Sequence, residues 1–157
     1  MRRALLAAAV AAVCARPVTV WADDCTVLRD AALATLQVRS GMRQYLTVGN
    51  RPERLVSVAA GDKVYLAMAP GQWTTLPRSE VQAEGSAAAK AYRGCHAVGQ
   101  EEVDGHAATV YAYTAAFDGM PAAAALAWIG RDGLIYRQAL PGGGVMRYEF
   151  KDVKPPR

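Results

Sequence analysis

The sequence predicts an α+β fold in which two helices alternate with antiparallel strands. Three Asp-Gly dipeptides, at residues 104–105, 118–119 and 132–133, follow one another at intervals of fourteen residues, and Asp-Gly is a strong signal for a tight hairpin. Two segments with helical patterns lie before and between the strand-like runs. The order is therefore a helix, a small antiparallel sheet, a second helix and a larger antiparallel meander.

Residues 1–22 have the pattern of a cleaved secretory signal peptide. A basic start is followed by an apolar run over residues 4–15, which is shorter than the roughly 20 residues that a membrane span needs. Cleavage after Ala22 would leave a mature chain that starts at Asp23, and cleavage after Ala15 also fits. We therefore expect an exported, periplasmic protein.

The mature chain has almost no net charge. Removing the signal peptide removes three arginines and lowers the number of basic residues from 18 to 15 against 14 acidic ones, which leaves +1. Binding to a phosphate backbone requires a concentrated positive field, so we expect no nucleic-acid partner. Residues 23–157 are one domain by length.

Cys25 and Cys95 are the two cysteines of the mature chain. An even pair in an oxidising compartment usually forms a disulfide, which here would close a loop worth about 4 kcal/mol in the chain-entropy model. A metal site with His96, or two free thiols, are alternatives that no motif supports. Cys14 could carry a lipid anchor, although Val13 precedes it where lipoprotein signals have a small residue.

The first helix is predicted from Asp23 and Asp24, which can cap it, to Ser40-Gly41, because its apolar residues recur at helical spacing. Strands are predicted over residues 43–48, 53–59, 63–68 and 72–76. The turn at Gly61-Asp62, with glycine first, suits type II′.

The second helix is predicted to begin at a capping box formed by Ser79 and Gln82 and to run through Tyr92. Gly94 stands where a helix commonly ends, and Gly85 in the middle costs about 1 kcal/mol relative to alanine. The meander follows, with strands over residues 106–117, 121–131, 134–140 and 145–151.

The meander carries few charges on either face. A half-exposed antiparallel sheet alternates apolar and polar residues, whereas residues 122–130 contain no charge at all. We expect the helices to cover one face and a ligand, a partner or the rest of the fold to cover the other. The four alanines at 122–125 leave room for a packed helix or for an apolar cavity. The cavity hypothesis assigns the lining to Tyr111, Tyr113, Phe117, Leu126, Trp128 and Trp73.

Few residues are suited to catalysis. His96 and His106 are the only histidines, and no nucleophile elbow, zinc-binding helix or P-loop occurs. We therefore expect no enzyme, no cofactor and no metal. Glu101, Glu102 and Asp104 form an acidic cluster that we interpret as a solvated strand end, since the calcium-binding EF-hand pattern is missing.

The chain resembles the outer-membrane lipoprotein carrier (LolA-like) family over about residues 43–156. The resemblance lies in the order of short motifs: a Val-Tyr pair before Trp73, a glycine followed by V-Y-x-Y, W-I followed by D-G-L, and a closing Tyr with Asp-Val. In this sequence they fall at residues 64–73, 105–113, 128–137 and 148–153. The resemblance implies an incomplete antiparallel β-barrel with helices packed in its concave face and an apolar cavity for acyl chains.

The function that this resemblance implies is non-enzymatic binding of lipid or lipoprotein acyl chains in the periplasm. No residue of the chain matches a functional residue of the family. The alternative is an envelope interaction or regulatory module with a filled interior and a protein partner. An empty space between sheet and helices would favour the first, and a filled one the second.

Overall fold

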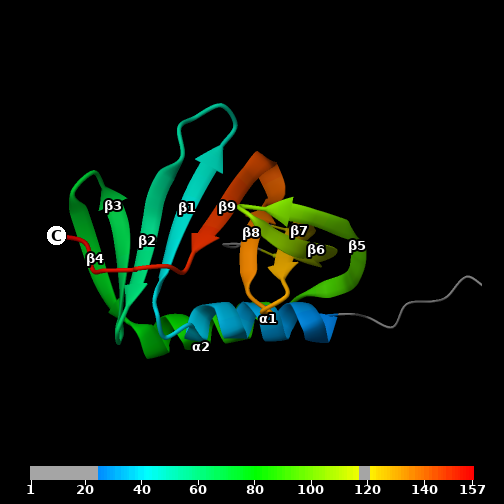
Figure 1. The fold of residues 1–157 in the computed structure, drawn as a ribbon, viewed down its shortest axis with the longest axis horizontal. Coiled ribbons are helices and arrows are strands. Elements are labelled where there is room, and N and C mark those ends of the chain that lie inside the picture. Colours follow the sequence, from blue (N-terminus) through cyan, green and yellow to red (C-terminus); the bar gives the residue numbers. More distant parts are fainter. Residues whose placement is uncertain (1–24, 117–120) are drawn as a thin grey trace, which may run out of the picture.

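The computed structural model describes residues 25–116 and 121–157 and shows nine antiparallel strands and two helices (Figure 1). The elements are α1 (Cys25–Gln37), β1 (Met42–Val48), β2 (Arg54–Ala60), β3 (Lys63–Ala69), β4 (Gln72–Pro77), α2 (Arg78–Ala89), β5 (Arg93–Val103), β6 (His106–Ala115), β7 (Ala123–Gly130), β8 (Ile135–Ala139), a 3-10 turn (Pro141–Gly143) and β9 (Gly144–Glu149). The strands form one open, curved sheet in the order β4-β3-β2-β1-β9-β8-β7-β6-β5. The predicted α+β fold with an incomplete antiparallel barrel is therefore confirmed.

The pairing of β1 with β9 joins what the sequence presents as two separate sheets. Its register runs from Arg43 opposite Glu149 to Val48 opposite Gly144. The C-terminal segment then crosses β1 and β2 towards β4 (Figure 1), and the Arg43 guanidinium donates to the carbonyls of Lys151 and Asp152. The prediction of two sheets was wrong because a pairing between residues about a hundred positions apart leaves no local signal.

The Asp-Gly turns differ from one another. Asp104 and Gly105 both have positive φ, 50° and 79°, as the predicted type I′ turn requires. At the next described turn only Gly133 has a positive φ, and its N–H donates to the carbonyl of Gly130 over 3.0 Å. The same dipeptide thus builds two turn geometries, and the third copy, at residues 118–119, lies outside the described residues.

Strand β5 is the element that the sequence did not reveal. Residues 96–102 are all exposed, so they show neither the alternation of a half-buried strand nor an apolar run. Two irregularities in its pairing with β6, between Arg93 and His96 and between Ala97 and Gly99, blur the pattern further. The predicted solvated strand end is part of this strand.

Helix α2 begins without the predicted capping box. It starts at Arg78, after Pro77, and no side chain caps it. The amide of Gln82 instead donates to the carbonyl of Leu36 over 3.1 Å, because the end of α1 lies beside the start of α2. The capping interaction is replaced by a contact between the helices.

The two helices run antiparallel, and each one supplies an arginine to the other's C-terminal end. The guanidinium of Arg78 donates to the carbonyls of Leu36, Val38 and Gly61. Arg29 of α1 donates to the carbonyls of Ala89 and Tyr92 over 3.2 and 2.9 Å. Most of these carbonyls lie in or just after the last turn of a helix, where the intrahelical hydrogen bonds end, and a cation at this end also favours the helix dipole.

Gly85 explains how closely the helices approach. A β-carbon at this position would lie 2.3 Å from Cδ1 of Leu36, so the Leu36 side chain would have to move to admit even an alanine. The conformational cost of a glycine inside α2 is thus offset by the packing of Leu36. Helix α1 lies against β5, β7 and β8, and α2 lies against β3 and β4.

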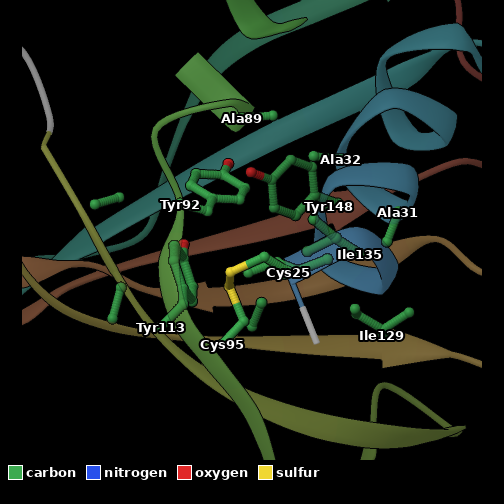
Figure 2. Close-up of a cluster of buried hydrophobic side chains, with 14 of the residues drawn as sticks. Cys25, Ala31, Ala32, Ala89, Tyr92, Cys95, Tyr113, Ile129, Ile135 and Tyr148 are labelled. Carbon is green, nitrogen blue, oxygen red and sulfur yellow. A yellow bond between two sulfur atoms is a disulfide. The ribbon is translucent and has the colours of Figure 1, made fainter. Parts of the chain in front are cut away.

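The disulfide between Cys25 and Cys95 is formed, with the Cα atoms 4.8 Å apart, and ties the start of α1 to β5. Both cysteines are buried in the larger of two cores, which fills the space between helices and sheet (Figure 2). The smaller core lies on the other side of the sheet and contains no helical residue. The metal and free-thiol alternatives for the cysteines are therefore wrong.

Replacing Arg78 by methionine should lower the free energy of unfolding by about 3 kcal/mol, because buried carbonyls at the end of α1 would lose charged donors. Urea denaturation with matched slopes measures this change. Arg54→Met, on the exposed side of β2, is the control and should stay within about 0.5 kcal/mol of the wild type. Equal losses in the two variants would contradict the role of Arg78.

Removing the disulfide with the double substitution Cys25→Ala and Cys95→Ala should cost about 4 kcal/mol, since the bond closes a loop that spans 70 positions. Denaturation of the oxidised wild type, the reduced wild type and the variant provides the comparison. Reduced wild type and variant should agree. If oxidised and reduced wild type unfolded at the same urea concentration, the bond would not be a structural one.

Candidate functional site

The helices cover only one end of the sheet face that they pack on. Met42, Ala59 and Val64 lie opposite one another on β1, β2 and β3 and are at most 4% exposed. Further along the same face of β3, Leu66 is half-buried and Met68 is 70% exposed. Burial thus decreases step by step with distance from the helices.

Strands β1 and β9 carry further apolar residues on this face, separated from those of β3 by Ser57 and Arg54 of β2. Leu46 and Met146 lie opposite each other and are half-buried, and Val48 is exposed. Alternation along the strands places these side chains on the same face as Met42. We name the set Leu46, Val48, Leu66, Met68 and Met146 the apolar shelf.

A small cavity lies where the shelf passes under α2. Its volume is about 50 Å³, whereas small-molecule sites occupy about 300–1,000 Å³. The walls are mostly apolar and come from both helices and from β1, β2 and β3: Leu36, Met42, Gln44, Ser57, Ala59, Val64, Leu66, Arg78, Val81 and Gln82. The cavity is therefore several times too small for a lipid.

The rest of the space between helices and sheet is filled by side chains of the protein. The rings of Tyr92 and Tyr113 are 4.8 Å apart, and Tyr148 lies across from Tyr92 above the disulfide (Figure 2). Tyr148 donates to the Gln138 side-chain carbonyl, whose amide donates to the Tyr113 hydroxyl over 3.0 Å. Burial raises the pKa of Tyr113 and of Tyr148 well above the ordinary value, so these two side chains stay neutral and act as hydrogen-bonding groups.

Helix α2 is held on the sheet by little apolar contact. Arg78 and Ala89, at its two ends, are its only buried residues, and Val81 is half-buried. The remaining positions are mainly alanine, glutamate and serine. The helix depends on α1 and on Arg78 more than on the sheet, so this is the part of the cover that separates most readily.

The residues predicted to line a cavity do not share one face. Tyr113 is buried in the larger core and Tyr111 packs at its margin. Trp128 lies opposite Val110, in the smaller core on the other side of the sheet, and Leu126 packs against that core. Strand register thus places Tyr113 and Trp128 on opposite faces of the sheet, and the lining of a ligand cavity by these residues stays a prediction.

The two other predicted lining residues lie elsewhere. Trp73 is a half-buried residue of the edge strand β4, opposite Ala67. Phe117 lies outside the described residues. The cavity that the structure does contain includes none of the six.

Trp128 is fixed by groups from β5 and β8. Its indole N–H donates to Oε2 of Glu101 over 2.7 Å, and the guanidinium of Arg137 lies 4.6 Å from the ring centre. Glu101 is therefore part of the cover over the smaller core and not only a solvated residue. This smaller core shields the face of the meander that the helices do not cover, which explains why these strands carry few charges on either face.

The described residues contain no arrangement typical of acid–base or metal chemistry. His96 is exposed and its Nδ1 contacts the carbonyl of Gly94 over 2.8 Å, whereas His106 stacks on Tyr136. Over residues 25–116 and 121–157, no three His, Cys, Asp or Glu side chains gather to hold a metal ion. Neither helix in these ranges is long and apolar enough to cross a membrane.

A charged cluster on the outer face joins three distant segments. Arg147 of β9 donates to both carboxylate oxygens of Glu53 over 2.9 and 2.8 Å and to Glu149 over 2.9 Å. It also lies 4.0 Å from Asp104 at the tip of the β5–β6 hairpin. Hydrogen bonds from Arg147 hold the pKa of Glu53 and of Glu149 below the ordinary value, against a smaller effect of burial. The cluster fixes the hairpin tip against the sheet.

The roles of the polar residues of the interior leave no local pattern in the sequence. Arg78, Gln138 and Arg29 each bind groups at least 25 positions away, and single-residue patterns do not reveal such partners. Gln138 offered one signal, since it is a polar residue in a strand predicted to be hidden on both faces. A buried amide of this kind needs partners.

The fold is similar to that of proteins with solved structures. The structure resembles the lipoprotein LppX of Mycobacterium tuberculosis, with a TM-score of 0.51 and 15% identity, over 85% of this chain and 96% of LppX. It resembles LprF of Mycobacterium bovis with a TM-score of 0.52 and 12% identity, over 85% of this chain and 95% of LprF. A LolA superfamily protein of Nitrosomonas europaea matches at 0.35 and 11% identity, over 82% of this chain and 92% of that protein.

No family model and no curated protein matches the sequence. At these levels of identity the likeness shows the fold alone. The chain has a fold similar to that of LppX and LprF, with an open antiparallel sheet and helices on its concave face, which is the architecture that its short motifs implied.

The charged cluster predicts a loss of stability in acid. Because folding lowers the pKa of Glu53 and Glu149, their contribution to the free energy of unfolding is complete above pH 4.5 and is lost as the pH falls through the folded-state values. These groups are more than a third exposed, so the contribution is about 1 kcal/mol at most. Urea denaturation at neutral and acid pH measures it.

Arg147→Met should reduce this acid-dependent loss, because the two carboxyl pKa values return towards normal. Arg131→Met, at an exposed position of the β7–β8 turn, serves as the matched control and should keep the wild-type pH dependence. An unchanged profile in Arg147→Met would show that other carboxylates cause the acid sensitivity.

Proposed function

We propose that this chain is a non-enzymatic, exported protein of the periplasm that binds acyl chains of a lipid or lipoprotein between α2 and the β1–β3 end of the sheet. The observation that supports it most is the apolar cavity under α2, which continues into the exposed apolar shelf. The LolA-like fold supports the same function, and the disulfide supports an oxidising compartment.

An acyl chain needs more room than the cavity offers, so α2 must move away from the sheet when it binds. The packing of α2 on the sheet is thin, so the main cost of this movement is the loss of its hydrogen bonds to α1 and to the β2–β3 turn, and the shelf supplies the apolar surface that the chain would cover. Tyr111, at the margin of the larger core, remains a candidate contact. The other predicted residues on the outer side, Leu126 and Trp128, play no part in this site.

The second candidate function is an interaction or regulatory module of the envelope with a protein partner. The observation that favours it is the filled interior, in which tyrosines and Gln138 occupy the space that a carrier would leave free. In this case the shelf would contact a protein, and α2 would stay in place. The two functions differ in whether the small cavity matters for binding.

The cavity-filling substitution Ala59→Met tests the proposal. Ala59 is 2% exposed and lines the cavity, so a longer side chain would occupy the volume that an acyl chain enters. We expect the affinity for a fluorescent fatty acid to fall about tenfold or more, as a loss of one or two buried methylene groups implies. Fluorescence titration of the purified mature protein measures the affinity.

Ala124→Met, on an exposed position of β7, is the matched control and should bind as the wild type does. Urea denaturation should show that both variants are folded. Native mass spectrometry of the wild type, purified from the periplasm without harsh detergent, should also show bound lipid. If the wild type neither carries lipid nor binds the probe, acyl-chain binding is ruled out and the interaction module remains.

A further inference from the structure

Strand β5 is an edge strand whose middle residues are exposed to solvent. It pairs with β6, and within the described ranges no strand pairs with its other edge. Residues 96–102 are exposed on both faces, which distinguishes β5 from every other long strand of the sheet. Its backbone N–H and C=O groups on the open side are thus available to another strand.

The middle of β5 lacks the features that protect sheet edges. Residues 97–100 contain no charge and no proline, and Val98 is 52% exposed. The opposite edge, β4, has only six residues and ends in Pro77. Edge strands are usually short, carry lysine or proline, or contain bulges, so β4 is protected by its length and its proline, and β5 only by the irregularities at residues 93–96 and 97–99. Residues 99–103 pair with β6 without such an irregularity.

The charges at the two ends of β5 are opposite. Lys90 and Arg93 lie at its start, and Glu101, Glu102 and Asp104 lie at its end. Within residues 25–116 and 121–157, no carboxylate lies within ion-pair distance of Arg93, whose Nη1 donates to the carbonyls of Lys90 and Tyr92. A strand with this distribution is complementary to an inverted copy of itself.

We propose that β5 pairs with β5 of a second copy of this chain in an antiparallel, two-fold arrangement centred near Val98. Each Arg93 then lies towards the end of the second copy's β5 that carries Glu102, and the two Val98 side chains meet near the axis. The pairing is isologous, so it closes after two copies and does not extend into a fibre. The two nine-stranded sheets become continuous.

The second copy is favoured over an unrelated partner because an antiparallel copy of β5 places acidic residues near the basic end and basic residues near the acidic end. A partner strand of uniform charge would satisfy one end and repel the other. An interface of one strand pair is small, so the dimer is a weak and reversible one. It uses a surface remote from the cavity under α2 and does not depend on acyl-chain binding.

Sedimentation velocity of the mature protein from micromolar to millimolar concentration tests the dimer. The wild type should shift from monomer to dimer, and Val98→Lys should remain monomeric, since it places two like charges at the axis. Val27→Lys, at a 43% exposed valine of α1, is the matched control and should dimerise as the wild type does. A wild type that stays monomeric, or equal weakening by both lysines, would overturn the proposal.

Charge exchange gives a second test of the same pairing. Arg93→Glu and Glu102→Arg should each weaken the dimer about tenfold, whereas the double variant should recover most of the affinity, because the inverted arrangement is restored. Chemical denaturation should show that each variant is folded. Failure of the double variant to recover, with folding intact, would show that β5 meets another surface or that the dimer uses a different face.

Discussion

The exchange of arginines between the two helices is the interaction on which the rest of the structure depends. Arg78 satisfies carbonyls at the end of α1, and Arg29 satisfies carbonyls at the end of α2, so neither helix ends properly without the other. Helices of 13 and 12 residues are marginal alone in water. Their mutual satisfaction makes them one unit, which the disulfide fastens to β5 and which covers one end of the sheet.

This unit determines where the protein can accept a ligand. Under α1 the interior is occupied by tyrosines and by the buried amide of Gln138. These side chains are joined by hydrogen bonds and fill the space that a ligand would need. Under α2 the contacts are few, and the apolar surface extends beyond the cover. The opposite face is closed by its own core around Trp128. The half of this sheet face under α1 is therefore rigid, and the half under α2 can adapt to a ligand.

Local sequence patterns predict much of the fold, but they predict little of the candidate site. Asp104-Gly105 specifies its turn because two positive φ angles exclude most other residues, and Cys25 with Cys95 is the only pairing that the mature chain allows. The face of Trp128 depends on its register opposite Val110, and the role of Arg78 depends on the end of another helix. Such long-range partners are invisible in a single sequence, and the fully exposed β5 carries no periodicity to detect.

Strand β9 is last in the chain and fifth in the sheet, between β1 and β8. The two halves of the sheet therefore remain unconnected until residues near the C-terminus are in place. A chain made from its N-terminus can form its hairpins early, but it gains its continuous sheet only when almost the whole chain is available. Completion of the sheet therefore waits for its last strand, and a truncation that reaches β9 would remove the centre of the sheet and not its margin.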